Sequence, residues 1–559
     1  MATLATSLRK GESEGPFHPM RLSLCLTFLT IFWAALYLPA LGVHELQGEE
    51  ARRVLPGRTM IQTGEWLVPR SGGEVYNRKP PLINWVSAAA IKLTGRMDEW
   101  TVRMPSVLMM LALGLSILLC LRGWLGNDQA LLTALITLTS IDLLFDKGRL
   151  VEIEALYISL FGIALVLWLG LRWHGRDLAA WLASGAVLGL GFLAKGPPHM
   201  WYFYALVMGV LFAEKRGRDL LNWKHFAGLA VFFAVWTPWA IMNSAHNPLN
   251  DSTAVWQDQI TQRLGFAEFN LKNYLLQVPQ SLVNFLPWTL LLPLCWHRNV
   301  VAIWHNKGRH GQWMLGLRRG LLWAFFVIAL LPSSRPRFML PVIVAAAVLV
   351  ADALACMGGE WLARWGRWWR RGMAAIASIG LVALVVGSIP FVTPLSEHQF
   401  EATGWVLWVM AACMIVSWLW RKPAPDTLPI FGISTAFAFT ILIGVFTFAV
   451  VPRIITHDKL RPFAMRIIEQ TGPTEPILLY KVAERMWPFY LGLRCFELAD
   501  PKDLAASKPF LWVIVPRNLW NSDPDGTLIK ARFGSVVAES PLSDPLDHTN
   551  YVLLRFAGR

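Results

Sequence analysis

HELQGEEARRVLPGRTMIQTGEWLVPRSGGEVYNRKPP, residues 44–81, is the first long polar passage in a chain that is otherwise mostly apolar. Its charged groups include two adjacent carboxylates, two arginines one residue after them and a basic cluster before two prolines: Glu49, Glu50, Arg52, Arg53 and Lys79. A plain tether between two membrane helices needs none of these groups. We therefore interpret the loop as the lid and the acid/base half of a functional site on the outer face of a membrane.

The composition is that of a polytopic membrane protein. The 559 residues are 55% hydrophobic and only 16% charged, and the mean hydropathy is +0.43, whereas a soluble domain usually carries about 25% charged residues. The net charge of +14 is explained by basic cytoplasmic loops. It does not indicate nucleic-acid binding, because the basic residues lie between apolar runs and not on one soluble face. The six cysteines form no CxxC pair, which argues against a disulfide framework and a zinc site.

Thirteen apolar runs are candidates for membrane-spanning helices, since a bilayer core requires about 20 apolar residues in a helix. They occupy residues 22–41, 104–122, 128–145, 155–172, 178–194, 200–213, 225–242, 277–295, 320–332, 337–354, 373–392, 402–420 and 428–452. The basic residues before the first run resemble a signal peptide, but the run is longer than a usual signal core. We expect an uncleaved first helix, with cleavage after Gly42 as the alternative.

Lysine and arginine accumulate in alternate loops, and this sets the expected orientation. The basic loops lie around residues 172–176, 215–224, 298–319, 364–371 and 421–422, and the loops between them are mixed and acid-bearing. The N-terminus is therefore predicted to be cytoplasmic. The first outer loop covers residues 42–103, and thirteen spans place the tail after Pro452 outside.

The last part of the chain, residues 453–559, predicts a small α/β domain that follows a transmembrane domain of residues 1–452. Residues 461–470 predict a helix, with Pro462 in its first turn and Gly472 just past its end. Buried strands are expected at 476–482, 509–516 and 551–557. The predicted fold class is mainly α, a helical membrane protein with a small C-terminal α/β domain on the outer side.

Four groups of polar residues gather at the predicted outer ends of the spans, where charged groups cost less than at membrane depth. They are the first loop, residues 146–154, the turn 195–199, and the loop 243–274 together with the turn 333–337. The candidate acids are Glu49, Glu50, Glu152 and Glu154. The candidate cations are Arg52, Lys79, Arg149, Lys195, Arg263, Arg335 and Arg337.

Each candidate also has a structural interpretation. Acids early in a helix suit the positive end of its dipole, which would explain Glu49 and Glu50, and a helix mouth tolerates solvated carboxylates such as Glu152 and Glu154. Lysines at a membrane surface extend to the headgroups, and arginines at helix ends serve as interface anchors. His199 and His246 are expected to be satisfied surface residues and not metal ligands.

The order of the motifs resembles the GT-C superfamily of polyprenyl-phosphate-dependent glycosyltransferases, in the branch of bacterial aminoarabinose transferases and protein mannosyltransferases. The matching segments are GEEARR (48–53), TGEWLVP (63–69), RKPPLINW (78–85), EWTVRMPSVL (99–108), AKGPP (194–198), WQDQITQRL (256–264), NFLPW (284–288) and SSRPRFMLP (333–341). Together they cover about residues 22–345 in order. The family's leading aspartate is Glu49 here, and its second-loop aspartate is Glu154. Both keep the charge but reach one methylene further, which leaves open whether donor and acceptor match those of the family.

The resemblance implies a site that faces the periplasm of a bacterial inner membrane. The donor would be a sugar on a polyprenyl phosphate, and the acceptor a glycan, lipid A or a protein. Glu49 would be the base, or the ligand of a divalent metal ion, and Glu154 a second acid that orients the acceptor. The residues expected at the phosphate are Lys79, Arg263, Arg335 and Arg337, with Lys195 as a further candidate. A carboxylate would take the acceptor's proton, and cations would offset the charge on the departing phosphate.

The alternative function is transport of the same lipid-linked sugars, as by a flippase. A transporter would favour paired repeats and charged residues in the middle of spans. The sequence shows no evident repeat, and its charges lie at the ends of spans, so a transferase is the favoured hypothesis.

Overall fold

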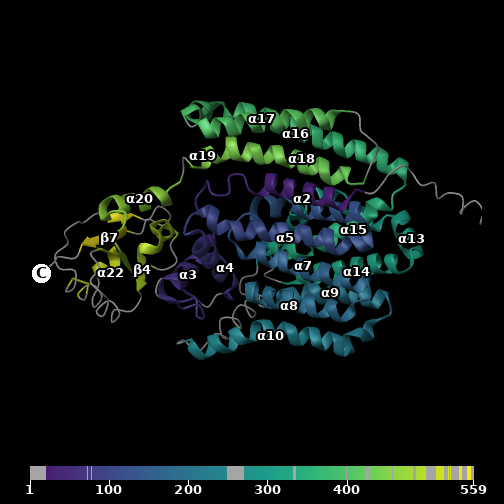
Figure 1. Ribbon diagram of the computed structural model, residues 1–559, viewed down its shortest axis with the longest axis horizontal. Helices are drawn as coiled ribbons and strands as arrows, with labels where there is room; N and C mark the ends of the chain where they lie inside the picture. Colours follow the sequence, from purple (N-terminus) through teal and green to yellow (C-terminus); the bar gives the residue numbers. More distant parts are fainter. Residues whose placement is uncertain are drawn as a thin grey trace, which may run out of the picture.

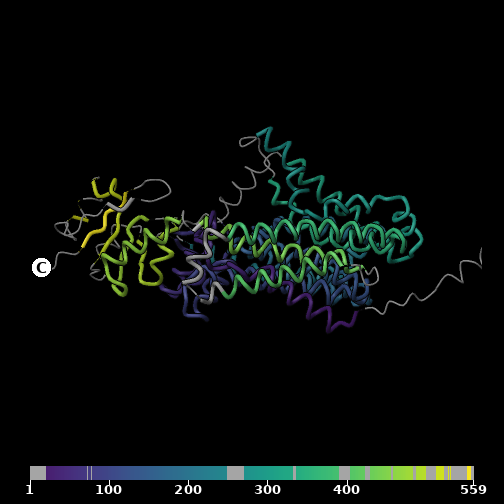
Figure 2. Tube along the Cα trace, turned by 90° about the horizontal axis from the view of Figure 1, so that it is seen from above, coloured from purple at the N-terminus to yellow at the C-terminus, as the bar shows by residue number. Residues whose placement is uncertain are grey.

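Long helices lie side by side in the computed structural model, and a small sheet lies beyond one end of this bundle (Figure 1). Figure 2, turned by 90°, again shows the sheet beyond the same end. The structure describes residues 20–71, 74–76, 79–247, 270–331, 335–397, 399–421, 428–455, 458–482, 486–498, 512–521, 527, 529–530, 541–543 and 550–555.

Nine helical segments within these residues are long and apolar enough to cross a membrane, so the chain is a multi-pass membrane protein. Five of them are single helices: α5 (Glu99–Leu125), α7 (Ile153–Trp173), α8 (Asp177–Lys195), α10 (Trp223–His246) and α14 (Gly308–Leu330). The others lie in η5 (Pro336–Val342) with α15 (Ile343–Ala355), in α16 (Gly359–Glu397), in α17 (Gln399–Trp420), and in α18 (Ile430–Val445) with η6 (Phe446–Val450) and α19 (Val451–Ile455). Shorter helices complete the bundle: α2 (Leu22–Tyr37), α6 (Asn127–Leu138) and α9 (Pro198–Ala213).

Every predicted apolar run overlaps a helix, but one predicted span is broken. The run 277–295 consists of α12 (Leu271–Val283) and the segment Trp288–Trp296, which meet at 93°. The segment comprises η3 (Trp288–Leu290) and η4 (Leu292–Trp296). Pro287 and Pro293 lack a backbone N–H and disfavour α-helical angles at the residue before them, which favours a break in the helix here.

The run 128–145 is also shorter as a helix than its apolarity suggests, because α6 ends at Leu138. The hydroxyls of Thr139 and Ser140 donate to the carbonyls of Leu135 (2.6 Å) and Ile136 (3.0 Å). Such back-bonding favours helix ends and bends. A one-turn π-helix, η1 (Leu143–Lys147), follows.

Two helices extend beyond their predicted apolar runs into regions that we expected to be basic loops. α14 begins at Gly308 and contains Arg309, Arg318 and Arg319, and α16 begins at Gly359 and contains the arginines of 364–371. Apolar residues mark only the part of a helix that lies within the hydrocarbon core. The length of a helix that continues beyond the core is therefore underestimated from its apolar residues.

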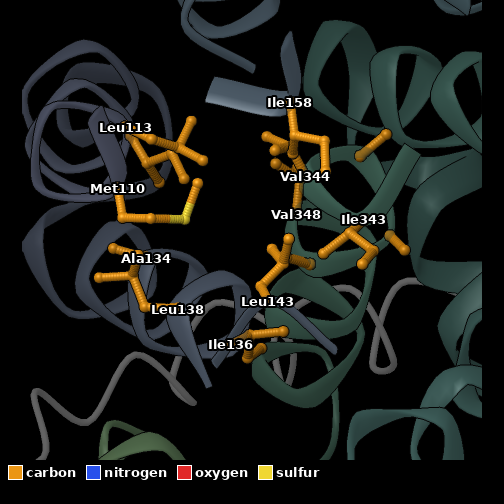
Figure 3. Close-up of a cluster of buried hydrophobic side chains, with 14 of the residues drawn as sticks. Met110, Leu113, Ala134, Ile136, Leu138, Leu143, Ile158, Ile343, Val344 and Val348 are labelled. Atoms are coloured by element: carbon orange, nitrogen blue, oxygen red, sulfur yellow. The ribbon is translucent and has the colours of Figure 1, made fainter. Parts of the chain in front are cut away.

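The core beneath η1 is built from five elements. Side chains of α5, α6, η1, α7 and α15 converge there, among them Met110, Leu113, Ala134, Ile136, Leu138, Leu143, Ile158, Ile343, Val344 and Val348 (Figure 3). All but Ile343, which is 4% exposed, leave at most 1% of their surface exposed. This packing fixes the start of α7, which carries Glu154 and directly follows Glu152.

Within the described residues, the C-terminal sheet has five strands in the order β4-β3-β5-β7-β6. The strands are β3 (Ile477–Tyr480), β4 (Cys495–Leu498), β5 (Trp512–Pro516), β6 (Pro541–Ser543) and β7 (Asn550–Arg555). β3 is parallel to β4 and β5, whereas β7 is antiparallel to β5 and β6. The three predicted strands correspond to β3, β5 and β7, and the predicted helix corresponds to α20 (Leu460–Thr471). The short strands β4 and β6 escaped prediction.

The first polar loop folds into α3 (Glu50–Thr63), a hairpin of β1 (Arg70–Ser71) and β2 (Glu74–Val75), and α4 (Leu82–Thr94). α3 ends at Gly64, whose φ of 74° lies in the left-handed region that glycine adopts most readily. In Figure 1, α3 and α4 lie between the bundle and the C-terminal sheet.

Several contacts fasten this loop to the C-terminal sheet. Arg58 forms a buried ion pair with Glu497 and donates to the carbonyl of Pro488 at 3.0 Å. The hydroxyl of Tyr490 accepts the backbone N–H of Leu46 at 2.9 Å. The loop is thus held on one side by the bundle and on the other by the last hundred residues of the chain.

A second set of contacts joins the loop to α20. The carboxylate of Glu45 accepts the backbone N–H groups of Lys459 (3.2 Å), Leu460 (3.1 Å) and Arg461 (2.5 Å). These N–H groups belong to the first turn of the helix, where a carboxylate is favoured. The Arg461 side chain donates in turn to Glu99, at the start of α5, at 2.9 Å.

Candidate active site

Glu50 is fully buried and locks the first loop onto the bundle. Its carboxylate forms a two-pronged pair with Arg103 of α5, with Nε at 2.9 Å from Oε1 and Nη2 at 2.8 Å from Oε2. It also accepts the backbone N–H groups of Val151 (2.9 Å) and Gln47 (2.8 Å). The remaining N–H groups of the guanidinium donate to the carbonyls of Leu41, His44 and Glu45. A buried ion pair is tolerated only when its hydrogen bonds are satisfied in this way, and both Glu50 oxygens are fully engaged.

Glu49 has the opposite environment although it is the next residue. Its side chain is 41% exposed and pairs with Arg52 at 2.8 Å and Arg53 at 3.1 Å. Arg53 also donates to the hydroxyl of Tyr76. The adjacent acids therefore separate into a buried clamp, Glu50, and a surface carboxylate, Glu49, which can meet a substrate.

The acids and bases of η1 lie next to the loop. Lys147 contacts Asp146 at 3.1 Å and Glu152, the residue before α7, at 3.0 Å. Burial raises the pKa of Glu152, whereas Lys147 opposes this shift. A Cβ atom added to Gly48 would lie 3.8 Å from Glu152 Oε1, so the first loop and the second acidic group meet at this point.

Glu154, at the first turn of α7, brings together cations from two other elements. Lys195 Nζ, at the end of α8, lies 3.1 Å from Glu154 Oε1, and Arg337 Nε of η5 lies 3.7 Å from the same oxygen. The ammonium of Lys195 also lies over the rings of Tyr157 (4.9 Å) and Phe338 (5.6 Å). Three of the predicted site residues thus form one cluster, although Lys195 and Arg337 follow Glu154 by more than 40 and more than 180 positions in the sequence.

The remaining predicted cations lie in different surroundings. Lys79 is half-buried just before α4, and Arg335 is exposed just before η5. Arg149 is buried and donates to the carbonyls of Leu36 (2.9 Å) and Pro39, so it fastens the end of α2; burial lowers its pKa to about 10. Arg263 lies outside the described residues.

A cavity of about 130 Å³ opens between the first loop, η1, the start of η6 and the end of α19. Its polar lining is formed by His44, Gln47, Arg103, Asp146 and Arg149, and Phe145, Phe446 and Ile454 are among its apolar walls. Burial, together with the nearby positive charge of Arg103, lowers the pKa of His44 to about 4. The imidazole is therefore neutral at physiological pH.

The structure corrects one histidine and adds two site residues. His199 is fully buried, not a surface residue, and its ring nitrogens contact the carbonyls of Gly196 (2.8 Å) and Leu188 (2.7 Å). His246 is exposed, as expected. Arg103 and Asp142 were missed. Arg103 lies at the edge of the apolar run 104–122, where a charged residue requires a partner, whereas Asp142 lies within the run 128–145.

No group of three or more His, Cys, Asp or Glu side chains in the described part of the chain is arranged to hold a metal ion. Glu49, the residue proposed from sequence as a metal ligand, is engaged by two arginines. These residues do not fit a metal site, so we derive no step through a metal.

Comparison with known proteins agrees with this architecture. Residues 78–242 match the family model described as dolichyl-phosphate-mannose-protein mannosyltransferase. Among curated proteins, an undecaprenyl phosphate-alpha-4-amino-4-deoxy-L-arabinose arabinosyl transferase of Pseudomonas fluorescens is 26% identical over 429 residues, or 72% of this chain and 73% of the relative. The enzyme of the same name from Pseudomonas aeruginosa is 26% identical over 436 residues, or 72% and 76%.

The fold has a solved counterpart. The crystal structure of ArnT from Cupriavidus metallidurans bound to undecaprenyl phosphate superposes with a TM-score of 0.65 over 95% of this chain and 97% of that chain, at 20% sequence identity. The fold, the matched family segment and the curated relatives converge on one class of enzyme. The chain is a multi-pass membrane glycosyltransferase whose sequence and fold are similar to those of the GT-C superfamily.

Proposed function

We propose that this enzyme transfers a sugar from a polyprenyl-phosphate donor to lipid A, a glycan or a protein on the periplasmic face of a bacterial inner membrane. The observation that carries the proposal is the cluster of Glu154, Lys195 and Arg337 beside the acid-bearing first loop. The names of the relatives, which include undecaprenyl phosphate, support this donor class.

The cluster is suited to a phosphate group. Arg337 Nε is buried and has no hydrogen-bond partner among the described residues, although Glu154 is near. Buried donors are nearly always partnered, so this N–H is available to a ligand oxygen. We assign Lys195 and Arg337 to the donor phosphate, with Lys79, Arg335 and Arg263 as further contacts. Two cations in a water-poor site offset the charge that develops on the departing phosphate.

Glu154 holds this pair of cations together before the donor arrives. Without it, two like charges would repel each other in a partly buried site, and an empty site would lose its geometry. Glu49, at the loop surface, is assigned to the acceptor. Glu50 and Arg149 act through the structure that they hold in place.

The orientation remains part of the proposal. The basic cytoplasmic loops support a cytoplasmic N-terminus and a periplasmic C-terminal α/β domain beginning near residue 453. A single cysteine introduced at Asn521 should react with a membrane-impermeant thiol reagent in spheroplasts, whereas one at Lys307 should not. The reverse labelling pattern would exclude a periplasmic site.

The transporter alternative gains no support. The relatives with curated names are transferases, and the charges of the site lie at helix mouths. A decisive experiment uses the purified protein in nanodiscs with a panel of radiolabelled polyprenyl-phosphate sugars and an envelope extract as acceptor. We expect transfer of label from one donor to an extractable acceptor. Movement of an intact donor across vesicle membranes, with no transfer, would favour transport.

A further inference from the structure

Asp142 lies at the mouth of the bundle, and its carboxyl group has no role in the function proposed above. It lies beyond the end of α6 and directly precedes the π-helix η1. Its backbone N–H donates to the carbonyl of Asn284 at 3.4 Å, and that of Ile141 donates to the carbonyl of Leu286 at 3.0 Å. The residue is therefore held against the bend between α12 and η3. Single π-turns are rare and often occur at functional sites.

One oxygen of this carboxyl group is left without a partner. Asp142 Oδ2 is buried and accepts no hydrogen bond from any residue that the structure describes. Leaving a buried acceptor unpaired costs about 1–3 kcal/mol, and such atoms are uncommon in folded proteins. The lone pairs of this oxygen are available to a proton or to a substrate hydroxyl.

Each of the other acids of the site has at least one oxygen engaged by a cation. Glu50 is saturated by Arg103 and two backbone N–H groups. Glu49 contacts two arginines, and Glu154 contacts Lys195 and Arg337. Glu152 pairs with Lys147. Each of these acids is thus paired with a cation, whereas Asp142 Oδ2 has no hydrogen-bond partner among the described residues.

The charges around Asp142 tune it for this role. Burial, and then the negative charge of Asp146, raise the pKa of Asp142 to about 6, and Lys147 opposes the shift. Glu152 and Glu154, on the α7 side, raise the pKa further. A base works best when its pKa lies near the operating pH, since it is then ionised but still binds a proton well.

We propose that Asp142 is the general base of the transfer, an inference that rests on the function proposed above. Asp142 removes the proton of an acceptor hydroxyl while the hydroxyl oxygen forms a bond to the anomeric carbon of the donor sugar. The bond from that carbon to the phosphate oxygen breaks, and its electron pair leaves with the polyprenyl phosphate, which gains one negative charge. Asp142 ends as a neutral carboxylic acid. The geometry thus assigns a hydroxyl acceptor, because an ionised phosphate oxygen would require no base.

The test is the pH dependence of transfer by the full-length protein in nanodiscs, measured from pH 5 to 8.5 with the donor found above. Wild-type transfer should fall as the pH decreases through about 6, because Asp142 becomes protonated. Asp142→Asn should lower the rate at pH 7.5 by roughly 100-fold, the usual scale for a lost proton-transfer group, and should abolish this acidic limb. Binding of polyprenyl phosphate by the variant should match wild type, since Asp142 acts on the acceptor.

Two neighbouring variants test the assignment without removing the carboxyl group. Asp146→Asn removes a negative neighbour, lowers the pKa of Asp142, and should move the acidic limb to lower pH. Lys147→Met removes a positive neighbour and should move the limb to higher pH. These opposite shifts test the proposal even if Asp142→Asn fails to fold.

Asp142→Asn with wild-type rate, or an acidic limb that persists in that variant, would overturn the assignment. So would an acidic limb that does not respond to either neighbour. If wild type transfers no sugar from any donor in the panel, the proposed function fails, and this inference fails with it. An active wild type with an active Asp142→Asn variant identifies a failure of this inference alone.

Discussion

Glu50 and Arg103, 53 positions apart in the sequence, form a two-pronged ion pair that is almost completely shielded from solvent, at 0% and 1% side-chain exposure. Through the same carboxylate, the first loop is joined to the residue before Glu152. The pair therefore sets the distance between the two acidic groups of the site. Its contribution is structural, and this separates it from the surface acid beside it.

Removing one partner of this pair should damage the fold more than the chemistry. Glu50→Gln leaves the Arg103 guanidinium buried without a counter-charge, which typically costs about 3–5 kcal/mol. We expect a large fall in thermal stability in detergent and little protein in the membrane. Paired replacement of both residues by apolar side chains of similar size should recover much of the stability. A stable but inactive Glu50→Gln protein would instead place Glu50 in the chemistry.

Glu49→Gln tests the surface acid, because the substitution keeps the shape and removes the charge. If Glu49 contacts the acceptor, transfer should fall by roughly 10- to 100-fold, in the range of one lost charge-assisted contact. The acidic limb of the pH profile should persist, since Glu49 is not the proton acceptor in our assignment. Thermal stability should change little, because the side chain is 41% exposed. Loss of the limb in this variant would return the role of base to Glu49.

If Lys195 contacts the donor phosphate, a neutral replacement of Lys195 and a replacement that keeps the charge should have different effects on transfer. Lys195→Met should reduce transfer by roughly 100- to 1000-fold, the scale of one lost electrostatic stabiliser. Lys195→Arg should restore only part, because a planar guanidinium replaces a compact ammonium. Lys224→Met is a matched control. Lys224 lies in the first turn of α10, which packs against α8, and is at the opposite end of this helix pair from Lys195. Equal activities of the two methionine variants would remove Lys195 from the site.

Lys79 distinguishes substrate binding from an interface role by the same logic. Pro80 follows it and restricts its backbone to extended angles, so the ammonium is pre-positioned. In the donor-binding role, Lys79→Met weakens polyprenyl phosphate binding and Lys79→Arg recovers it partly. In the interface role, Lys79→Arg is silent and Lys79→Met changes binding little. Measurement of polyprenyl phosphate affinity, without any acceptor, separates the two roles.

The stability of the folded protein should depend on pH through Asp458, which lies just before α20 and near Glu45. Burial, and then the negative charge of Glu45, raise the pKa of Asp458 to about 6. The ionised form is therefore disfavoured in the fold. The free-energy cost of carrying ionised Asp458 in the folded state is absent below the unfolded pKa near 4. It grows as the pH rises and is complete above about 6. Asp458→Asn removes this cost, so it should stabilise the protein at pH 7.5 by on the order of 1 kcal/mol or less after solvent screening. The thermal melting point should be unchanged at pH 4, and an equal rise at both pH values would exclude this explanation.

The sequence predicted the helices and the two acidic groups because these depend on local patterns. Apolar runs of the required length locate helices wherever the backbone is regular, as in α7 and α8. The break at Pro287 follows from two prolines, which a count of apolar residues does not weigh. The π-turn at η1 lies beside backbone hydrogen bonds to a distant segment, so the pattern could not reveal it. The different roles of Glu49 and Glu50 depend on Arg103, which reaches Glu50 from another helix. Asp142 lay within an apolar run, where its position at the mouth could not be recognised before α6 was seen to end early.

The hydrogen bonds between Glu45 and the start of α20 have a consequence for the biosynthesis of the enzyme. The carboxylate and the helix end that it caps are 415 positions apart in the case of Leu460. A ribosome that has already delivered the first loop to the membrane must translate nearly the whole message before the partner of Glu45 emerges. Until then, the loop that carries Glu49 lacks one of its two supports. A prematurely terminated chain therefore cannot hold this loop as the full-length enzyme does.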